Sequence, residues 1–250
     1  MKRNHFKRFA ALALSAVCGA ACLAGCGTQP TAATALEAIQ QPKTGSYEDW
    51  ELIQQTRQEN PVSEHTFAAL DHFTYTTAAQ VLGEDADGSY SPLSLYYALA
   101  LAATGAAGET QTQMLDLLGI SDPAQLSDQC AKLYRLLSRD NEVGTLRLAN
   151  SLWMDQRVDW KQSFVTQAAQ DFYAEVYQVD FTTDEAPKAM AQWVAQQTGG
   201  LLTPTFQPTD QQVLSLLNTV YFKDEWYDRF QSKNTQSDTF TKADGSQVTC

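Results

Sequence analysis

Residues 89–120, which read SYSPLSLYYALALAATGAAGETQTQMLDLLGI, indicate the fold more strongly than any other stretch of the chain. A short strand-like segment leads into a Ser-Pro pair, which is typical of a helix start, and then into a run rich in alanine and leucine. No charged residue occurs from 91 to 107. Only a fully buried helix tolerates such a composition, so the stretch predicts a core helix of a sizeable domain.

The composition is that of a globular protein, with 44% hydrophobic and 18% charged residues in a chain of 250. Four of the 17 basic residues lie in the first eight positions, and without them 13 basic residues face 29 acidic ones, a formal charge of −16. So acidic a surface repels phosphate groups and favours basic partners. We therefore expect no nucleic-acid partner and no charge-driven membrane binding.

The N-terminus is typical of an export signal. A basic start precedes an apolar run from 9 to 24, and the run ends in Leu-Ala-Gly-Cys at 23–26, the pattern of a bacterial lipoprotein. We predict a signal peptide at 1–25 and lipid attachment at Cys26, which would anchor an exported protein to the cell envelope. An ordinary signal peptide with an incidental cysteine is the alternative. Cys18, Cys22 and Cys26 lie inside this signal, so their spacing does not indicate a metal site.

Residues 26–59 are rich in threonine, glutamine, proline and alanine, which predicts a flexible tether. We expect the folded domain to occupy 60–250. At its start, Asn60 can cap a helix that has Pro61 in its first position, and Phe67, Phe73 and Val81 then follow at helical spacing.

Beyond residue 120, helix and strand patterns alternate. Helices are predicted after the capping residues Asp122 and Asp159 and around 190–194, the last ending near 199–200. Strands are predicted at 146–154 and 175–181, and the apolar run 213–222 is typical of a central strand covered on both sides. Cys130 falls on the apolar face of the first of these helices, so we expect it to be a free, buried thiol, although the sequence leaves pairing with Cys250 open.

Five strings in this order resemble the serpin family over 61–250. They are SPLS and its helix, LRLANSLWMDQ (146–156), VDF (179–181), MAQWVAQQTGGLL (190–202) and LLNTVYFKDEW (216–226). The resemblance implies an α+β serpin fold, in which helices pack around a large central mixed sheet. It also implies that the C-terminal portion of this fold lies beyond residue 250.

The resemblance assigns Ser91, Ser94 and Asn218 to the family's shutter, the place where the central sheet opens. Each residue also has a simpler interpretation. Ser91 before a proline is a helix N-cap, Ser94 can fill a small space between helices, and the amide of Asn218 in an apolar strand needs a hydrogen-bond partner. The two interpretations are compatible.

Trp226 matches the tryptophan of the family's breach, at the top of the sheet, and simple core packing is the alternative for this residue. Two positions depart from the family pattern. Asp224 stands where glycine is usual, and Ala191 where asparagine is common.

The resemblance implies a suicide-substrate inhibitor of serine proteases, with cysteine proteases as a second class of target. Its reactive-centre loop lies outside these 250 residues. We expect a surface-tethered protein that is monomeric when complete and touches the membrane only through its lipid. A non-inhibitory or truncated serpin-like lipoprotein, with a binding or structural role, is the alternative. The hinge before the loop discriminates between them, because small residues can enter a sheet whereas proline or charge obstructs it.

No enzyme motif accompanies these features. His65 and His72 lie on one helix, without a Gly-x-Ser-x-Gly turn or a metal-ligand spacing around them. No glycine-rich phosphate loop follows a predicted strand. We therefore expect no catalytic residue, no cofactor and no metal.

Overall fold

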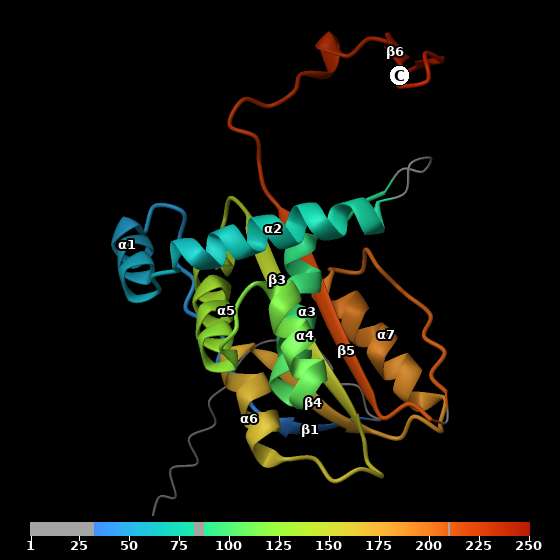
Figure 1. Cartoon of the computed structure of the whole chain (residues 1–250). Helices are drawn as coiled ribbons and strands as arrows, with labels where there is room; N and C mark the ends of the chain where they lie inside the picture. Colours follow the sequence, from blue (N-terminus) through green and yellow to red (C-terminus); the bar gives the residue numbers. More distant parts are fainter. Residues whose placement is uncertain (1–32, 83–87, 210) are drawn as a thin grey trace, which may run out of the picture.

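The computed structural model describes residues 33–82, 88–209 and 211–250 (Figure 1). The strands are β1 (Thr34–Glu37), β2 (Arg139–Asp140), β3 (Thr145–Asp155), β4 (Ala174–Val179), β5 (Leu214–Lys223), β6 (Thr239–Thr241) and β7 (Gln247–Thr249). The helices are α1 (Trp50–Glu59), α2 (Glu64–Val81), α3 (Pro92–Gly105), α4 (Gly108–Leu118), α5 (Pro123–Leu137), α6 (Gln162–Asp171) and α7 (Glu185–Gln197), with one 3-10 turn at Ser232–Asn234.

Strand β3 is the centre of a mixed sheet that has five strands in the described part of the chain. On one side it pairs in parallel with β4 over 150–155 and in antiparallel with the short β2 at 145–146. On its other side it pairs in antiparallel with β5 along 145–154. Strand β1 extends the sheet beyond β4. The observed α+β architecture agrees with the predicted fold class.

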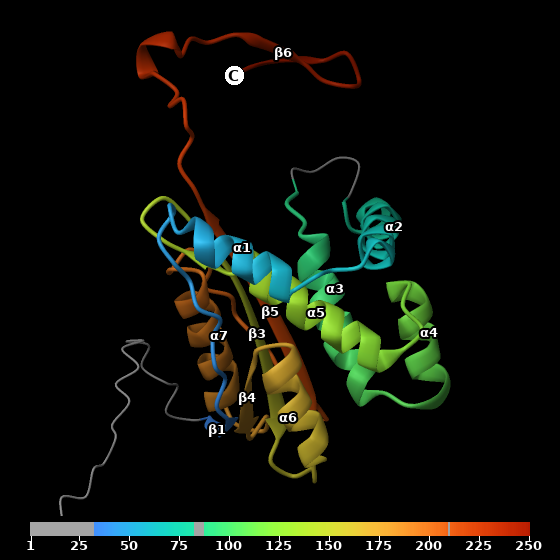
Figure 2. The same cartoon turned by 90° about the vertical axis from the view of Figure 1, so that its left-hand side faces the viewer.

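The alternation of side chains along β3 divides the interior into two hydrophobic clusters. Leu148, Leu152 and Met154 face the cluster that contains helices α2 to α6, whereas Ala149 and Trp153 face the cluster beneath α7. Figure 2 shows α7 on one side of β3 and β5, and α3, α4 and α5 on the other. The sheet is thus covered on both faces, which the long apolar strands require.

Helix α3 is the predicted core helix. The hydroxyl of Ser91 caps it by accepting a hydrogen bond from the Ser94 N–H (3.3 Å), and no residue from 92 to 104 is exposed. Tyr96 and Tyr97 are buried completely, but their hydroxyls donate to the carbonyl oxygens of Leu118 (3.1 Å) and Cys130 (2.7 Å). These bonds offset the cost of burying two phenols and connect α3 to α4 and α5.

Residues 33–59 differ from the predicted flexible tether, because the structure folds them onto the domain. Strand β1 pairs with the edge of β4, with Thr34 opposite Gln178, and α1 contacts α5. Tyr47 lies edge-on to Trp50 and beneath the guanidinium of Arg139. Edge pairing uses backbone groups that every residue except proline supplies in full, so a polar composition does not prevent it.

Two predicted helix starts are wrong. Asn60 ends α1 instead of beginning α2, and Ser63 is the N-cap of α2, with its hydroxyl accepting from the Thr66 N–H (3.1 Å). Pro61 therefore precedes α2 instead of occupying its first position. Helix α6 begins at Gln162, its N-cap residue is Lys161, and no side chain caps it. The prediction that Asp159 caps this helix is therefore wrong. Several polar residues near each start could act as caps, and tertiary packing selects among them.

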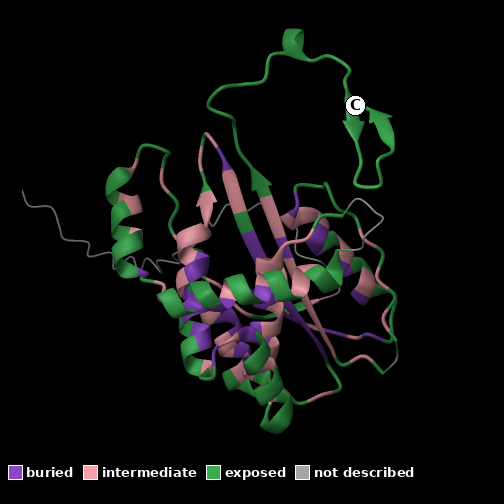
Figure 3. Ribbon diagram, turned by 45° about the horizontal axis from the view of Figure 1, so that its top comes forward, coloured by how far each residue is buried: buried purple, intermediate pink, exposed green. Residues whose placement is uncertain are grey.

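Strand β5 is less covered than predicted. Among the described residues it pairs only with β3, and most of its side chains are half-buried. Residues 224–250 then extend away from the sheet and are exposed along their whole length (Figure 3). One edge of β5 is consequently without a strand partner in the described part of the chain.

Cys130 is buried in α5 and Cys250 is exposed, and both are free. This agrees with the expected buried thiol. Burial raises the pKa of Cys130 well above its usual value, so the thiol stays protonated and inert.

Candidate functional site: a hydrogen-bond chain across the sheet

The three predicted shutter residues come together where the start of α3 meets β5. The Ser94 hydroxyl donates a hydrogen bond to the amide oxygen of Asn218, across 124 positions of sequence. Ser91 takes part indirectly, since its hydroxyl caps the backbone of Ser94. The helix-cap interpretation of Ser91 is therefore correct. Ser94 does more than fill space, and Asn218 has the partner that its amide requires.

Asn150 of β3 continues this chain, and sequence reasoning missed it. The Asn218 amide nitrogen donates to the Asn150 amide oxygen (2.5 Å), and the Asn150 nitrogen donates to the carbonyl oxygen of Phe172 (2.7 Å), which precedes β4. The two asparagines are register partners in the β3–β5 ladder. An amide on the otherwise apolar face of 146–154 was the available signal.

We call Ser94, Asn218, Asn150 and the Phe172 carbonyl the cross-sheet chain. It joins α3, β5, β3 and the start of β4, and Asn150 is only 4% exposed. Each asparagine uses both its donor and its acceptor within the chain. Losing one member leaves a poorly solvated amide unpaired, at a cost of about 1–3 kcal/mol. The chain therefore adds to the backbone ladder that holds β5 to β3, and the loss of any member weakens this contribution.

Asp155 ends β3 with a buried carboxylate. Its side chain is fully buried, and Arg157 binds it through Nε (2.8 Å), Nη2 (2.8 Å) and the backbone N–H (2.7 Å). Hydrogen bonds from the Arg157 side chain hold the pKa of Asp155 below its usual value, against the opposing effect of burial. The Asp155 carbonyl also accepts from the Trp160 indole (3.0 Å), so this residue fixes the turn after β3.

Trp226 does not join the cross-sheet chain. It lies three residues beyond the end of β5, is 71% exposed, and makes an edge-to-face contact with Phe230 (5.8 Å between ring centres). The core-packing alternative is therefore not what the structure shows. Asp224, which departs from the family pattern, forms an ion pair with Arg139 of β2 (3.2 Å).

The remaining predicted positions carry no site in the described residues. His65 and His72 are both exposed on α2. Within 33–82, 88–209 and 211–250, no group of three or more His, Cys, Asp or Glu side chains is placed to hold a metal ion. No helix in these same ranges has the length and apolarity needed to cross a membrane. Cys26 and the signal peptide lie outside the described residues.

Known proteins resemble the chain in both sequence and structure. The family model described as serpin (serine protease inhibitor) matches residues 68–250. A serpin-like protein of Thermococcus kodakarensis is 28% identical over 198 residues, covering 76% of this chain and 45% of that protein. Serpin B6 of Macaca fascicularis is 31% identical over 171 residues, covering 64% and 46%.

The solved structure of the thermophilic serpin tengpin in its native state aligns with a TM-score of 0.67 at 23% identity, covering 87% of this chain and 54% of that one. The solved structure of tengpin in its latent state aligns with a TM-score of 0.68 at 24% identity, covering 75% of this chain and 52% of that one. The chain thus spans about half the length of the relatives it matches. Because the family model matches most of its residues, the chain belongs to the serpin family.

Proposed function

We propose that this chain supplies the central sheet of a protease inhibitor that traps its target by inserting its own cleaved loop as a strand. One observation carries the proposal. The cross-sheet chain attaches β5 to β3 and α3 through the residues that match the family's shutter, in a chain whose residues 68–250 match the serpin family model. A loop that enters a sheet as a new strand needs strands that can part, and a cluster of polar side chains between the elements provides such a place.

The chemistry of this inhibition belongs to the target. A serine protease attacks a peptide bond in the inhibitor's exposed loop and becomes an acyl-enzyme. Insertion of the loop then displaces the attached protease before hydrolysis. Cysteine proteases are the second class of target. The resemblance implies that the family's reactive-centre loop lies beyond residue 250, so we propose the activity for a protein that includes this loop.

The same proposal places the protein outside the cytoplasm. A signal peptide at 1–25 and a lipid on Cys26 would leave the domain on the cell envelope, in contact with the membrane only through the anchor. The acidic charge disfavours nucleic acid, and we expect a monomer. Replacing Cys26 by serine should abolish incorporation of radiolabelled fatty acid. Persistent labelling of the variant would contradict the anchor.

Inhibition is tested by mixing the full-length gene product with proteases of the trypsin, chymotrypsin, elastase and papain classes. We expect one class to lose activity in step with a covalent complex that survives SDS. Its mass should equal the summed masses of inhibitor and protease less the C-terminal fragment that is released when the scissile bond breaks. Loop cleavage by all four without any complex would reject inhibition. That outcome would favour a non-inhibitory serpin with a binding or structural role on the envelope.

A further inference from the structure

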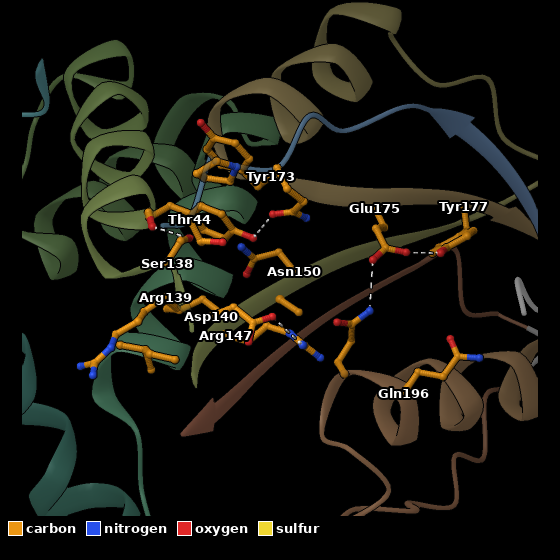
Figure 4. Close-up of a pocket in the computed structure, with 17 residues that line it drawn as sticks. Thr44, Ser138, Arg139, Asp140, Arg147, Asn150, Tyr173, Glu175, Tyr177 and Gln196 are labelled. Atoms are coloured by element: carbon orange, nitrogen blue, oxygen red, sulfur yellow. Dashed lines mark hydrogen bonds and ion pairs between the residues drawn. The ribbon is translucent and has the colours of Figure 1, made fainter. Parts of the chain in front are cut away.

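A cavity of about 740 Å³ lies beside β3, between the C-terminal ends of α5 and α7 (Figure 4). Residues 146–150 of β3 and the start of β4 form one wall, and residues 41–44 of the N-terminal segment contribute another. Cavities of this size hold small ligands in many proteins. The volume is sufficient for a molecule of a few amino-acid residues.

The β3 edge that borders this cavity is missing part of its ladder. The pairs with β2 end at Leu146 and those with β4 begin at Asn150, so neither ladder includes Leu148. The Asp155 N–H donates to the carbonyl oxygen of Val213, just before β5, so the backbone groups of Asp155 point to the β5 edge. The N–H and C=O groups of successive residues point to alternate edges of a strand, so those of Leu148, seven residues earlier, point to the opposite edge. The N–H and C=O of Leu148 therefore face the cavity, where an extended chain could pair with them.

The charges around the cavity are unequally neutralised. Arg139 forms an ion pair with Asp224 (3.2 Å) and Arg147 with Asp140 (3.8 Å). Glu175 of β4, by contrast, has no ion pair in the described part of the chain.

Neutral donors hold the Glu175 carboxylate in place at the cavity. The Tyr177 hydroxyl donates to one oxygen, and the Gln197 amide donates to the other (3.2 Å) (Figure 4). The cavity thus holds one oriented negative charge that lacks a positive partner, which suits a cation.

Tyr173 lies in the cavity wall, where contacts with neighbouring residues fix its position. Its backbone has a φ of +51°, in the left-handed region that tyrosine rarely adopts. The ring stacks on Tyr134 at 4.2 Å, and its hydroxyl accepts from the Arg135 guanidinium (3.0 Å). Surrounding contacts therefore maintain an unfavourable backbone conformation beside the cavity, a situation that is common at binding sites.

We propose that this cavity binds a short basic peptide in an extended conformation. The peptide backbone pairs with Leu148 and fills the interval between the β2 and β4 ladders, as in strand addition. A lysine or arginine of the peptide reaches the carboxylate of Glu175. The acidic charge of the protein attracts such a peptide to the surface. The inference does not depend on protease inhibition.

The test uses the blocked peptide acetyl-VTKVT-amide, whose β-branched residues favour an extended chain, and the full-length protein. We expect saturable binding by calorimetry with a Kd below about 1 mM, and slower hydrogen exchange of the Leu148 N–H when the peptide is bound. Glu175→Gln should weaken binding at least about tenfold, since a charged hydrogen bond is lost. No saturable binding would overturn the proposal.

Two controls separate this site from charge attraction alone. Glu109→Gln removes the same charge from α4, remote from the cavity, and should leave the Kd within about twofold. Equal weakening by both substitutions would contradict the proposal. The second control is a pair of N-methylated peptides, blocked either at residues 2 and 4 or at residues 1, 3 and 5. Strand addition predicts that only one of the pair loses binding, whereas equal binding by both would rule it out.

Discussion

Asn218 of β5 donates a hydrogen bond to Asn150 of β3, its direct register partner, at 2.5 Å. The bond runs between two side chains on one face of the sheet, next to the N-terminus of α3, and the Ser94 hydroxyl completes it. The cross-sheet chain thus strengthens the contact between β3 and β5, which must break if these strands part. Its three side chains, Ser94, Asn150 and Asn218, come from three separate elements, and each can be removed individually.

Asn218→Ala should lower the melting temperature of the full-length protein and increase polymer formation, because the amide of Asn150 and the hydroxyl of Ser94 lose their partner. We expect a loss of about 1–3 kcal/mol, measured by chemical denaturation, and size-exclusion chromatography reports the polymer. The matched control is Thr219→Val on the next residue, whose buried hydroxyl has no partner among the described residues. This change should be neutral or slightly stabilising. An Asn218 variant as stable and monomeric as the wild type would contradict the assignment.

Gly119→Ala should destabilise the protein more than Gly200→Ala. Both glycines have positive φ, +70° and +82°, so alanine costs about 1 kcal/mol of backbone strain at either position. At Gly119 the new Cβ would also lie 2.9 Å from the Cβ of Ala69, whereas nothing lies within 4 Å at Gly200. Denaturation midpoints compare the two variants. Equal midpoints would mean that α2 and α4 do not approach so closely.

Asp155→Asn should reduce stability at pH 7 by about 1–3 kcal/mol, since the charged hydrogen bonds with Arg157 are weakened. The folded-state pKa of Asp155 lies below the unfolded value, so its contribution is complete above about pH 4 and is lost as the pH falls through the folded pKa. The variant should therefore differ from the wild type less in acid than at neutral pH. Thermal melts from pH 2 to 7 measure the difference. Asp159 is an exposed neighbour, and Asp159→Asn serves as the control. This substitution should change neither the stability at pH 7 nor the dependence of stability on pH.

Cys130 should resist thiol reagents in the native protein, because it is 1% exposed and burial raises its pKa. Cys250 is exposed and should react. Peptide mapping after iodoacetamide treatment distinguishes the two sites, and treatment in denaturant should label both. Modification of Cys130 at the rate of Cys250 under native conditions would show that α5 opens readily.

Much of the fold could be predicted from local patterns. The uncharged run at 91–107 indicated α3, the strand predicted at 146–154 corresponds to β3, and the alternation in 175–181 indicated β4. Helix starts were harder, because Asn60 and Ser63 both have capping side chains and the contacts with α5 select between them. The tether prediction was wrong for 33–59, since pairing of β1 with β4 depends on backbone groups and leaves no side-chain pattern.

In the candidate site, too, some features follow from the sequence and others only from the tertiary structure. Sequence alone determined that Ser94 and Asn218 are polar residues within apolar elements and that each therefore needs a partner. Only the tertiary structure decided that they are partners of each other, that Asn150 joins them from 68 positions away, and that Trp226 is exposed. Local sequence sets periodicity and capping, because these depend on neighbouring residues. Hydrogen bonds between distant residues depend on strand register and on which elements meet, and those are settled by the packing of the whole chain.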